Sequence, residues 1–235
     1  NTIDPAPASP GTGRSTPATM KIVHYLFSTD QRLGGPVRAV SDLCLLLAKG
    51  GNDVSLVTSI PTDAPTGWTG ADGTPRLVVV PPPARPGKVF SKPQVAAMRP
   101  LIAGADALHL HGIWELFNIQ LAKTATAAGV PYFISTRGML DEYCFDHRGF
   151  KKRVYMALFA RRWLAGARRI HCTADEELRQ SQRFFPAGRG VVIPNLMDLA
   201  PFADPLGPDL ARQKFPFLPA PRPVAVFLGR LHPIK

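Results

Sequence analysis

The chain has 235 residues, of which 45% are hydrophobic and 9% aromatic, and its formal net charge is +11. A chain of this length and composition can form a conventional apolar core, which excludes a protein that is disordered throughout. The positive charge favours anionic partners such as nucleotides, phosphorylated lipids, membrane surfaces or nucleic acid, without choosing among them.

The first 19 residues are mostly Pro, Ala, Ser, Thr and Gly and have no periodic apolar positions. Such a segment cannot bury enough surface to fold, so residues 1–19 are expected to be a disordered tail. The segment also lacks the apolar centre of a secretory signal. The folded chain is therefore expected to begin at Met20.

From Met20 onward, short apolar runs alternate with amphipathic runs. The apolar runs predict strands at 21–27, 53–58, 76–80, 107–111, 132–136, 169–173 and 191–193. The amphipathic runs predict helices at 37–49, 93–103, 115–128, 150–165 and 175–184. This alternation predicts an α/β domain with a doubly wound, Rossmann-like parallel sheet over residues 20–204.

Prolines crowd residues 205–223, which are expected to form a linker with one short helix near Leu210. Residues 224–228 then form a fresh apolar run that predicts another strand, and the sequence ends at Lys235. A single strand has no partner within so short a segment. Residues 224–235 are therefore expected to be the start of a truncated second domain.

The three cysteines, Cys44, Cys144 and Cys172, stand far apart and form no C-x-x-C pair. This odd, scattered set argues against a disulfide framework and a structural zinc site, and it fits a reducing compartment. No apolar run reaches the roughly 18 residues needed to cross a bilayer. The expected location is the cytoplasm, with peripheral attachment at the inner face of the cell membrane left open.

Two glycines follow the first predicted strand and precede the first helix, where doubly wound sheets bind ligands. The backbone amides of Gly34 and Gly35, together with the helix dipole, could hold a phosphate group. An ordinary flexible turn is an equal alternative at this position. The G-x-G-x-x-G pattern is absent, which argues against a bound NAD.

Polar side chains also follow the fourth and fifth predicted strands. His109 and His111 share one strand face, but no third metal ligand is evident nearby, so no metal site is expected. His109 is expected to be packed and hydrogen-bonded, and His111 to point into the cleft, where it can bond a hydroxyl or carry a proton. Arg137 could hold an acceptor phosphate, with an ion pair to Asp141 or Glu142 as an equal alternative.

A basic stretch covers residues 148–169, which include no acidic residue and interleave Phe150, Val154, Leu158 and Trp163 with Lys and Arg. A helix of this kind can lie on an anionic membrane, although a solvated face is the commoner outcome. The sequence has no recognisable nucleic-acid-binding motif, so nucleic acid is not an expected partner. It also has no D-x-D triplet, which favours metal-independent chemistry.

The sharpest pattern lies in residues 229–235, directly after the apolar run at 224–228. Arg230 and Lys235 stand five positions apart in this segment. Two cations at the end of a strand can bind a diphosphate and stabilise it as it leaves.

From about Met20 to Lys235 the sequence resembles a family 4 (group 1) glycosyltransferase of the GT-B architecture, in which two Rossmann-like domains face each other. The resemblance rests on the Gly34-Gly35 loop and on four segments in the same order: HLHGIW at 109–114, ISTRGML at 134–140, VIPNLMD at 192–198 and FLGRLHPIK at 227–235.

The resemblance implies that a sugar is transferred, with retention of configuration, from a nucleoside diphosphate sugar to a hydroxyl of a glycan or lipid-linked acceptor, such as a cell-surface polysaccharide precursor. It implies no cofactor and no metal, the nucleotide sugar being a co-substrate. His111 would be the catalytic histidine near the donor sugar, and Gly34 and Gly35 would approach the donor diphosphate. Arg230 and Lys235 would neutralise this diphosphate as it leaves.

The sequence departs from the family in two places. Residues 195–198 read NLMD where the family usually has N-G-V-D, so this segment is given no role in the site. The acidic E-x7-E segment that holds the donor in the family lies beyond Lys235, so the chain is expected to be incomplete for activity. A GT-B epimerase or phosphorylase, and a non-catalytic sugar- or nucleotide-binding fragment, stay open as alternatives.

Overall fold

The structure is a computed structural model that describes residues 18–83, 89–146, 149–196, 203–204, 207–217 and 223–225. Two of the predicted site residues, Arg230 and Lys235, lie outside the described residues, as do residues 1–17 of the predicted tail and residues 226–228 of the last predicted strand. The roles and conformations expected for them stay predictions.

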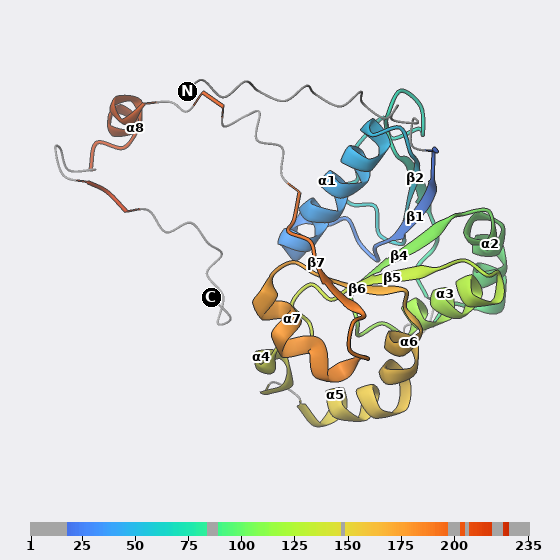
Figure 1. The fold of residues 1–235 in the computed structure, drawn as a ribbon. Helices are drawn as coiled ribbons and strands as arrows, with labels where there is room; N and C mark the ends of the chain where they lie inside the picture. Colours follow the sequence, from blue (N-terminus) through green and yellow to red (C-terminus); the bar gives the residue numbers. More distant parts are fainter. Residues whose placement is uncertain are drawn as a thin grey trace, which may run out of the picture.

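The centre of the fold is a seven-stranded sheet in the order β3-β2-β1-β4-β5-β6-β7 (Figure 1). All six strand pairings are parallel, which confirms the predicted doubly wound sheet. The strands are β1 (Lys21–Tyr25), β2 (Asp53–Thr58), β3 (Arg76–Val79), β4 (Ala107–His111), β5 (Tyr132–Ser135), β6 (Arg169–Cys172) and β7 (Gly190–Val192).

Helices connect the strands largely where the amphipathic runs predict them. They are α1 (Gly35–Lys49), α2 (Lys92–Ala103), α3 (Leu116–Ala127), α4 (Glu142–Asp146), α5 (Gly149–Tyr155), α6 (Arg161–Gly166), α7 (Asp175–Ser181) and α8 (Pro208–Lys214). The helix predicted at 150–165 is interrupted by a π-helical turn, η2 (Met156–Ala160), and single 3-10 turns occur at η1 (Gln31–Leu33) and η3 (Gln182–Phe184). Helix α8 confirms the short helix predicted near Leu210.

The two faces of the sheet are covered differently. On one face, α1 packs Val40 and Cys44 against Leu56 of β2. On the opposite face, α2, α3 and α6 cover a larger core that includes Leu108 and Leu110 of β4 (Figure 1). Because side chains alternate along a strand, His109 and His111 of β4 point to the face that carries α1.

Candidate active site

The site lies at the point where the strand order reverses, between β1 and β4. The chain leaves β1 toward β2 on one side, and β4 continues toward β5 on the other. The loops beyond the carboxyl ends of such neighbouring strands diverge and leave room for a ligand. The glycine loop follows β1, and His111 is the last residue of β4.

The glycine loop ends in an uncapped helix N-terminus. Gly34 has φ 99° and ψ −159°, a conformation that is essentially restricted to glycine. Because glycine has no side chain, no side-chain hydrogen bond caps the first turn of α1. Gly35 is exposed, and a Cβ atom on it would meet nothing within 4 Å. The N-terminus of α1 therefore borders open space at Gly35. Because Pro36 has no N–H and the amide of Val37 bonds to the carbonyl oxygen of Gly34, only Gly35 among these three residues can offer an amide to an anion.

Three histidines form a cluster under this edge of the sheet. Nδ1 of His24 lies 3.2 Å from Nε2 of His111, and the ring of His109 lies 4.3 Å from that of His111 and 5.1 Å from that of His24, centroid to centroid. His24 contributes the third ring because β1 pairs with β4 in a register that places it beside His109. The expectation that no third ligand lies near His109 and His111 is therefore wrong.

The structure also corrects the predicted exposure of His111. Its side chain does not point into an open cleft, because the residue is only 5% exposed and its ring stacks on that of His24. His109 is half-buried and hydrogen-bonded to Ser135, as predicted. The sequence shows which residue ends the strand, but it does not show that the neighbouring strand places a second imidazole against it.

Burial keeps the clustered imidazoles neutral. Desolvation, aided by the positive charge of Arg137, lowers the pKa of His24 to about 3. Desolvation also holds the pKa of His109 and of His111 well below the usual value, and the neighbouring histidines and Arg137 add to the effect. Near pH 7, His111 can thus donate or accept a hydrogen bond but does not carry a proton as an imidazolium.

A hydrogen-bonded relay continues from the cluster across β5 and β6. Nε2 of His171 donates to the carbonyl oxygen of Ile193 at 2.7 Å, which leaves Nδ1 of His171 as an acceptor because burial lowers the pKa of this ring and keeps it neutral. Ser135 Oγ then donates to Nδ1 of His171 at 2.8 Å and accepts from Nε2 of His109 at 2.8 Å. The lone pair of His109 is therefore on Nδ1.

Arg137 lies on the loop after β5 and has φ 52°, which is uncommon outside glycine. Its Nη1 donates to Oδ1 of Asn195 at 2.5 Å, while its Nε is buried and has no hydrogen-bond partner among the described residues. It makes no ion pair within 4.0 Å to Asp141 or Glu142, both of which the structure describes, so that alternative is not observed. Burial lowers the pKa of its guanidinium, an effect that the charge of Glu177 opposes.

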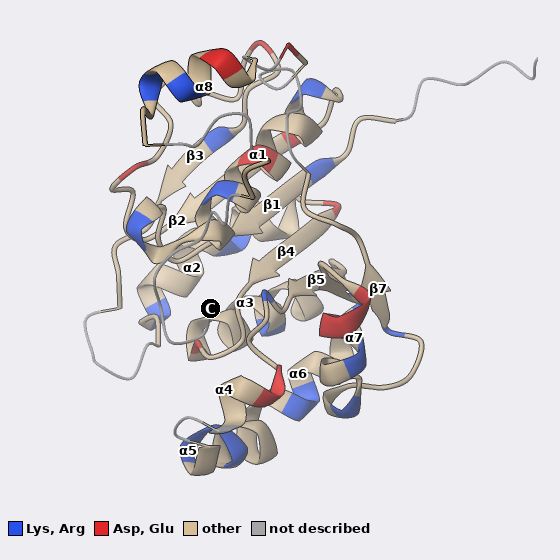
Figure 2. Ribbon diagram, turned by 90° about the vertical axis from the view of Figure 1, so that its left-hand side faces the viewer, with Lys and Arg blue, Asp and Glu red and all other residues tan. Residues whose placement is uncertain are grey.

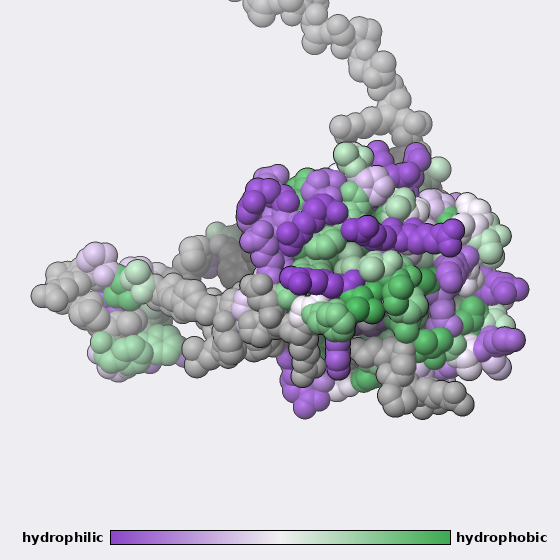
Figure 3. Space-filling view, turned by 90° about the horizontal axis from the view of Figure 1, so that it is seen from below, coloured by the Kyte–Doolittle hydropathy of each residue, from purple (hydrophilic) through white to green (hydrophobic). Residues whose placement is uncertain are grey.

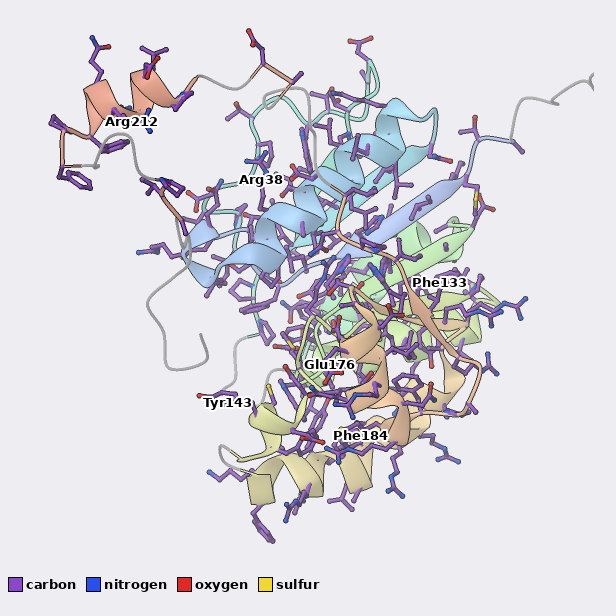
Figure 4. All side chains as sticks on the ribbon, turned by 60° about the vertical axis from the view of Figure 1, so that its left-hand side comes forward. Arg38, Phe133, Tyr143, Glu176, Phe184 and Arg212 are labelled. Carbon is purple, nitrogen blue, oxygen red and sulfur yellow. The ribbon has the colours of Figure 1, made fainter. Side chains whose placement is uncertain are left out.

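Glu177, in α7, holds the loops after β5 and β6 in place. Its Oε1 accepts hydrogen bonds from Oγ1 of Thr136 and from the amide of Gly138 at 2.6 Å, and its Oε2 accepts from the amide and hydroxyl of Thr173 at 2.6 and 2.8 Å. Arg137 stands between the first two donors. Figure 4 labels the adjacent Glu176 on α7, which faces solvent. Sequence analysis missed Glu177 because it lies among three acidic residues that suit any first helical turn.

The fold is a doubly wound α/β domain in which a helix N-terminus, a histidine cluster and Arg137 lie near the switch point of the sheet. Residues 34–196 match the family model of the glycosyl transferase 4-like domain, and the chain belongs to this family. No curated protein sequence matches the chain.

Two similar solved structures share the fold. Alr3699/HepE from Anabaena, in complex with UDP-glucose, is 14% identical, with a TM-score of 0.58, and the match covers 83% of this chain and 49% of HepE. A glycosyltransferase from Rickettsia africae is 12% identical, with a TM-score of 0.55, and the match covers 86% of this chain and 51% of that one. The chain thus spans about half the length of these two proteins.

Proposed function

We propose that this chain is the acceptor-binding half of a retaining glycosyltransferase that moves a sugar from a nucleoside diphosphate sugar to a hydroxyl of a glycan or lipid-linked acceptor, such as a polysaccharide precursor. Membership of the glycosyl transferase 4-like family supports the reaction class. The structure of HepE with UDP-glucose supports a nucleotide sugar as the donor. The observation that carries the proposal is the exposed N-terminus of α1 at the switch point, with Arg137 on the loop after β5 at the same carboxyl edge of the sheet.

In this proposal the donor diphosphate approaches Gly34 and Gly35. The space over Gly35 is open, and the amide of Gly35 and the helix dipole both favour an anion. Arg230 and Lys235 would neutralise the diphosphate as it leaves, in the role that their sequence pattern predicts. Hydrogen bonds and these cations supply the stabilisation, so the reaction needs no metal or other cofactor.

Arg137 is proposed to bind the acceptor. Its buried Nε lacks a hydrogen-bond partner among the described residues, and Nη1 contacts only a neutral amide oxygen. With Nε enclosed, the guanidinium can bind a phosphate or carboxylate of the acceptor through its two terminal nitrogens, Nη1 and Nη2. Glu177 acts as a positioning residue, because its hydrogen bonds to Thr136 and Gly138 fix the backbone on either side of Arg137.

His111 is proposed as the catalytic residue nearest the donor sugar, where its neutral ring bonds a hydroxyl. Nδ1 of His111 is the atom available for this bond, since it has no partner among the described side chains and backbone groups. With only 5% of the residue exposed, the ring must turn toward the carboxyl end of β4 to reach a sugar. The His111 contact therefore forms on donor binding in this proposal.

The surface of α5, η2 and α6 is proposed to touch an anionic membrane at its inner, cytoplasmic face. Phe150 is 80% exposed, and Leu158 is 69% exposed. Figure 2 shows basic residues on α5 and α6, and Figure 3 shows exposed apolar side chains beside strongly hydrophilic ones on the underside of the molecule, where α5 lies in Figure 1. No helix among the described residues is long and apolar enough to cross a membrane.

A donor-panel assay tests the proposal. The full-length gene product is incubated with UDP-, GDP- and ADP-sugars and a lipid-linked glycan acceptor, and nucleotide release is measured. We expect acceptor-dependent release with one donor class, and a kcat/KM reduced about 100-fold or more in Arg137→Ala and His111→Ala, since removal of one stabilising donor costs about that much. Arg99→Ala, which removes an exposed arginine of α2 on the opposite face of the sheet, is the matched control and should keep full activity.

Two results would contradict the proposal. One is the absence of nucleotide release from every donor in the presence of acceptor. The other is transfer activity that survives in both the Arg137 and the His111 variants.

A further inference from the structure

The histidine cluster contains buried nitrogen atoms that the protein itself leaves unpaired. Nε2 of His24 and Nδ1 of His111 have no hydrogen-bond partner in the part of the chain that the structure describes. Buried polar atoms of native proteins are almost always paired, because an unpaired one loses its hydrogen bonds to water without replacement. The remaining nitrogen of each ring, Nδ1 of His24 and Nε2 of His111, faces the other ring, and these inner nitrogens are the ones that an ion between the rings would meet.

The spacing of the rings suits a single ion. One nitrogen from each of His24, His109 and His111 can be chosen so that all three atoms lie within 4.8 Å of one another. The closest pair, Nδ1 of His24 and Nε2 of His111, is separated by 3.2 Å. Two imidazole nitrogens bound to one tetrahedral Zn²⁺ at about 2.0–2.1 Å are about 3.3 Å apart.

The relay through Ser135 prepares the third ligand. Because Nε2 of His109 donates to Ser135 Oγ, the lone pair of His109 lies on Nδ1, which stays available to an ion. Metal-bound histidines usually donate their other ring N–H to an oxygen in this way, which fixes both the tautomer and the ring orientation. This second shell extends through His171 to the carbonyl oxygen of Ile193.

We propose that His24, His109 and His111 form a binding site for a divalent d-block cation, with Zn²⁺ as the best-fitting ion and a fourth position open to water. Three imidazoles without a carboxylate favour such ions over Mg²⁺ or Ca²⁺, which prefer oxygen ligands. The positive charge of Arg137 acts on all three rings and repels a cation, so it weakens the site. The ion supplies no step of the proposed sugar transfer, and because His111 cannot both bind the ion and turn toward a donor sugar, the ion and the donor exclude each other at this residue.

Cobalt binding tests the site directly. The 235-residue chain is stripped of metal and titrated with Co²⁺, and its visible absorption is recorded before and after addition of Zn²⁺. We expect the bands of a tetrahedral or five-coordinate Co²⁺ centre, which Zn²⁺ abolishes. His24→Asn and His109→Asn should lose the bands, and Ser135→Ala should weaken binding about 10-fold, as second-shell changes do. His147→Asn, which removes a histidine far from the three in the sequence, is the control and should keep them.

Arg137→Gln distinguishes a metal site from a histidine cluster that only stabilises the fold. Removal of the positive charge should tighten Co²⁺ and Zn²⁺ binding, while it abolishes the acceptor contact assigned to Arg137. The metal titrations need neither donor nor acceptor, so their failure and failure of the transfer reaction are separate results.

The unmodified chain gives a test that does not depend on the folding of any variant. Long-range ¹H–¹⁵N spectra resolve the imidazole nitrogens, and Zn²⁺ should shift one ring nitrogen of each of His24, His109 and His111. Absence of a Co²⁺ spectrum together with unshifted imidazole signals would overturn the proposal. So would shifts confined to His147 or His232.

Discussion

Replacement of Glu177 by Gln tests the reasoning about the loops that carry Arg137. In the wild type each carboxylate oxygen accepts two hydrogen bonds, from Thr136 and Gly138 on one side and from Thr173 on the other. Gln has a single acceptor oxygen, so one of these pairs must face an NH₂ group that can only donate. Hydrogen bonds to a charged group contribute about 1.5–3 kcal/mol each, and loss of one pair with partial relaxation should lower the free energy of unfolding by about 2–4 kcal/mol.

The pH dependence provides a second measure of the same carboxylate. Burial alone would raise the pKa of Glu177, but the hydrogen bonds from Thr136, Thr173 and Gly138 outweigh it and hold the pKa below its usual 4.5. The unfolded chain therefore takes up the proton first, and the contribution of Glu177 to stability is complete above about pH 4.5 and is lost as the pH falls through the folded-state value. Glu177→Gln should lack this part of the acid destabilisation.

Urea unfolding at pH 7 and pH 4, followed by circular dichroism, measures both effects. Glu176→Gln is the matched control, because Glu176 is the preceding residue, is exposed and bonds only to Arg179 and Gln180. Its unfolding midpoint should stay close to that of the wild type. A Glu177→Gln protein that unfolds at the wild-type urea concentration at both pH values would refute the argument.

Three further predictions concern the glycine loop, the packing of β5 and a buried thiol. Gly35→Ala should leave the free energy of unfolding unchanged, because its Cβ meets open space, but should weaken donor diphosphate binding measured by calorimetry. Gly34→Ala should lower the free energy of unfolding by about 1–3 kcal/mol through backbone strain. Equal stability losses in the two variants would contradict this assignment. Tyr132→Phe should lower stability by about 1 kcal/mol in urea unfolding, since it removes the 2.6 Å bond from the phenol to the carbonyl oxygen of Trp163, and an unchanged midpoint would count against that bond. Cys44 should resist Ellman's reagent at pH 8 until the protein unfolds, because it is fully buried and burial raises its thiol pKa; rapid labelling of this residue in the native protein, located by mass spectrometry, would show the core to be open there.

The sheet could be predicted from the sequence because its strands are buried on both faces and therefore read as continuous apolar runs. β4 and β2 occupy the predicted residues, and the long helices differ from the prediction by one or two residues at their ends. The π-helical turn at 156–160 could not be predicted, because its composition also suits an α-helix. The short α4 carries too few residues to show a helical period.

The sequence predicted the position of a site residue only where that residue comes directly after a strand along the chain. Gly34, Gly35 and Arg137 have this property, and the structure places them at the expected edge of the sheet. His24 was missed because it stands inside an apolar strand, and its partner His109 comes 85 residues later. Strand order and register, which a single sequence does not reveal, bring these two rings together.

Two side chains of the candidate site also bind the segment that follows β7. Beyond β7, the carbonyl oxygen of Ile193 is held by His171, and the side chain of Asn195 is held by Arg137. In the acceptor complex proposed above, a guanidinium that turns toward the acceptor gives up its bond to Asn195. His171 in turn bonds through Ser135 to the ring of His109. The side chains at the edge of the sheet, Arg137 and His171, are therefore also the ones that hold the first residues beyond β7.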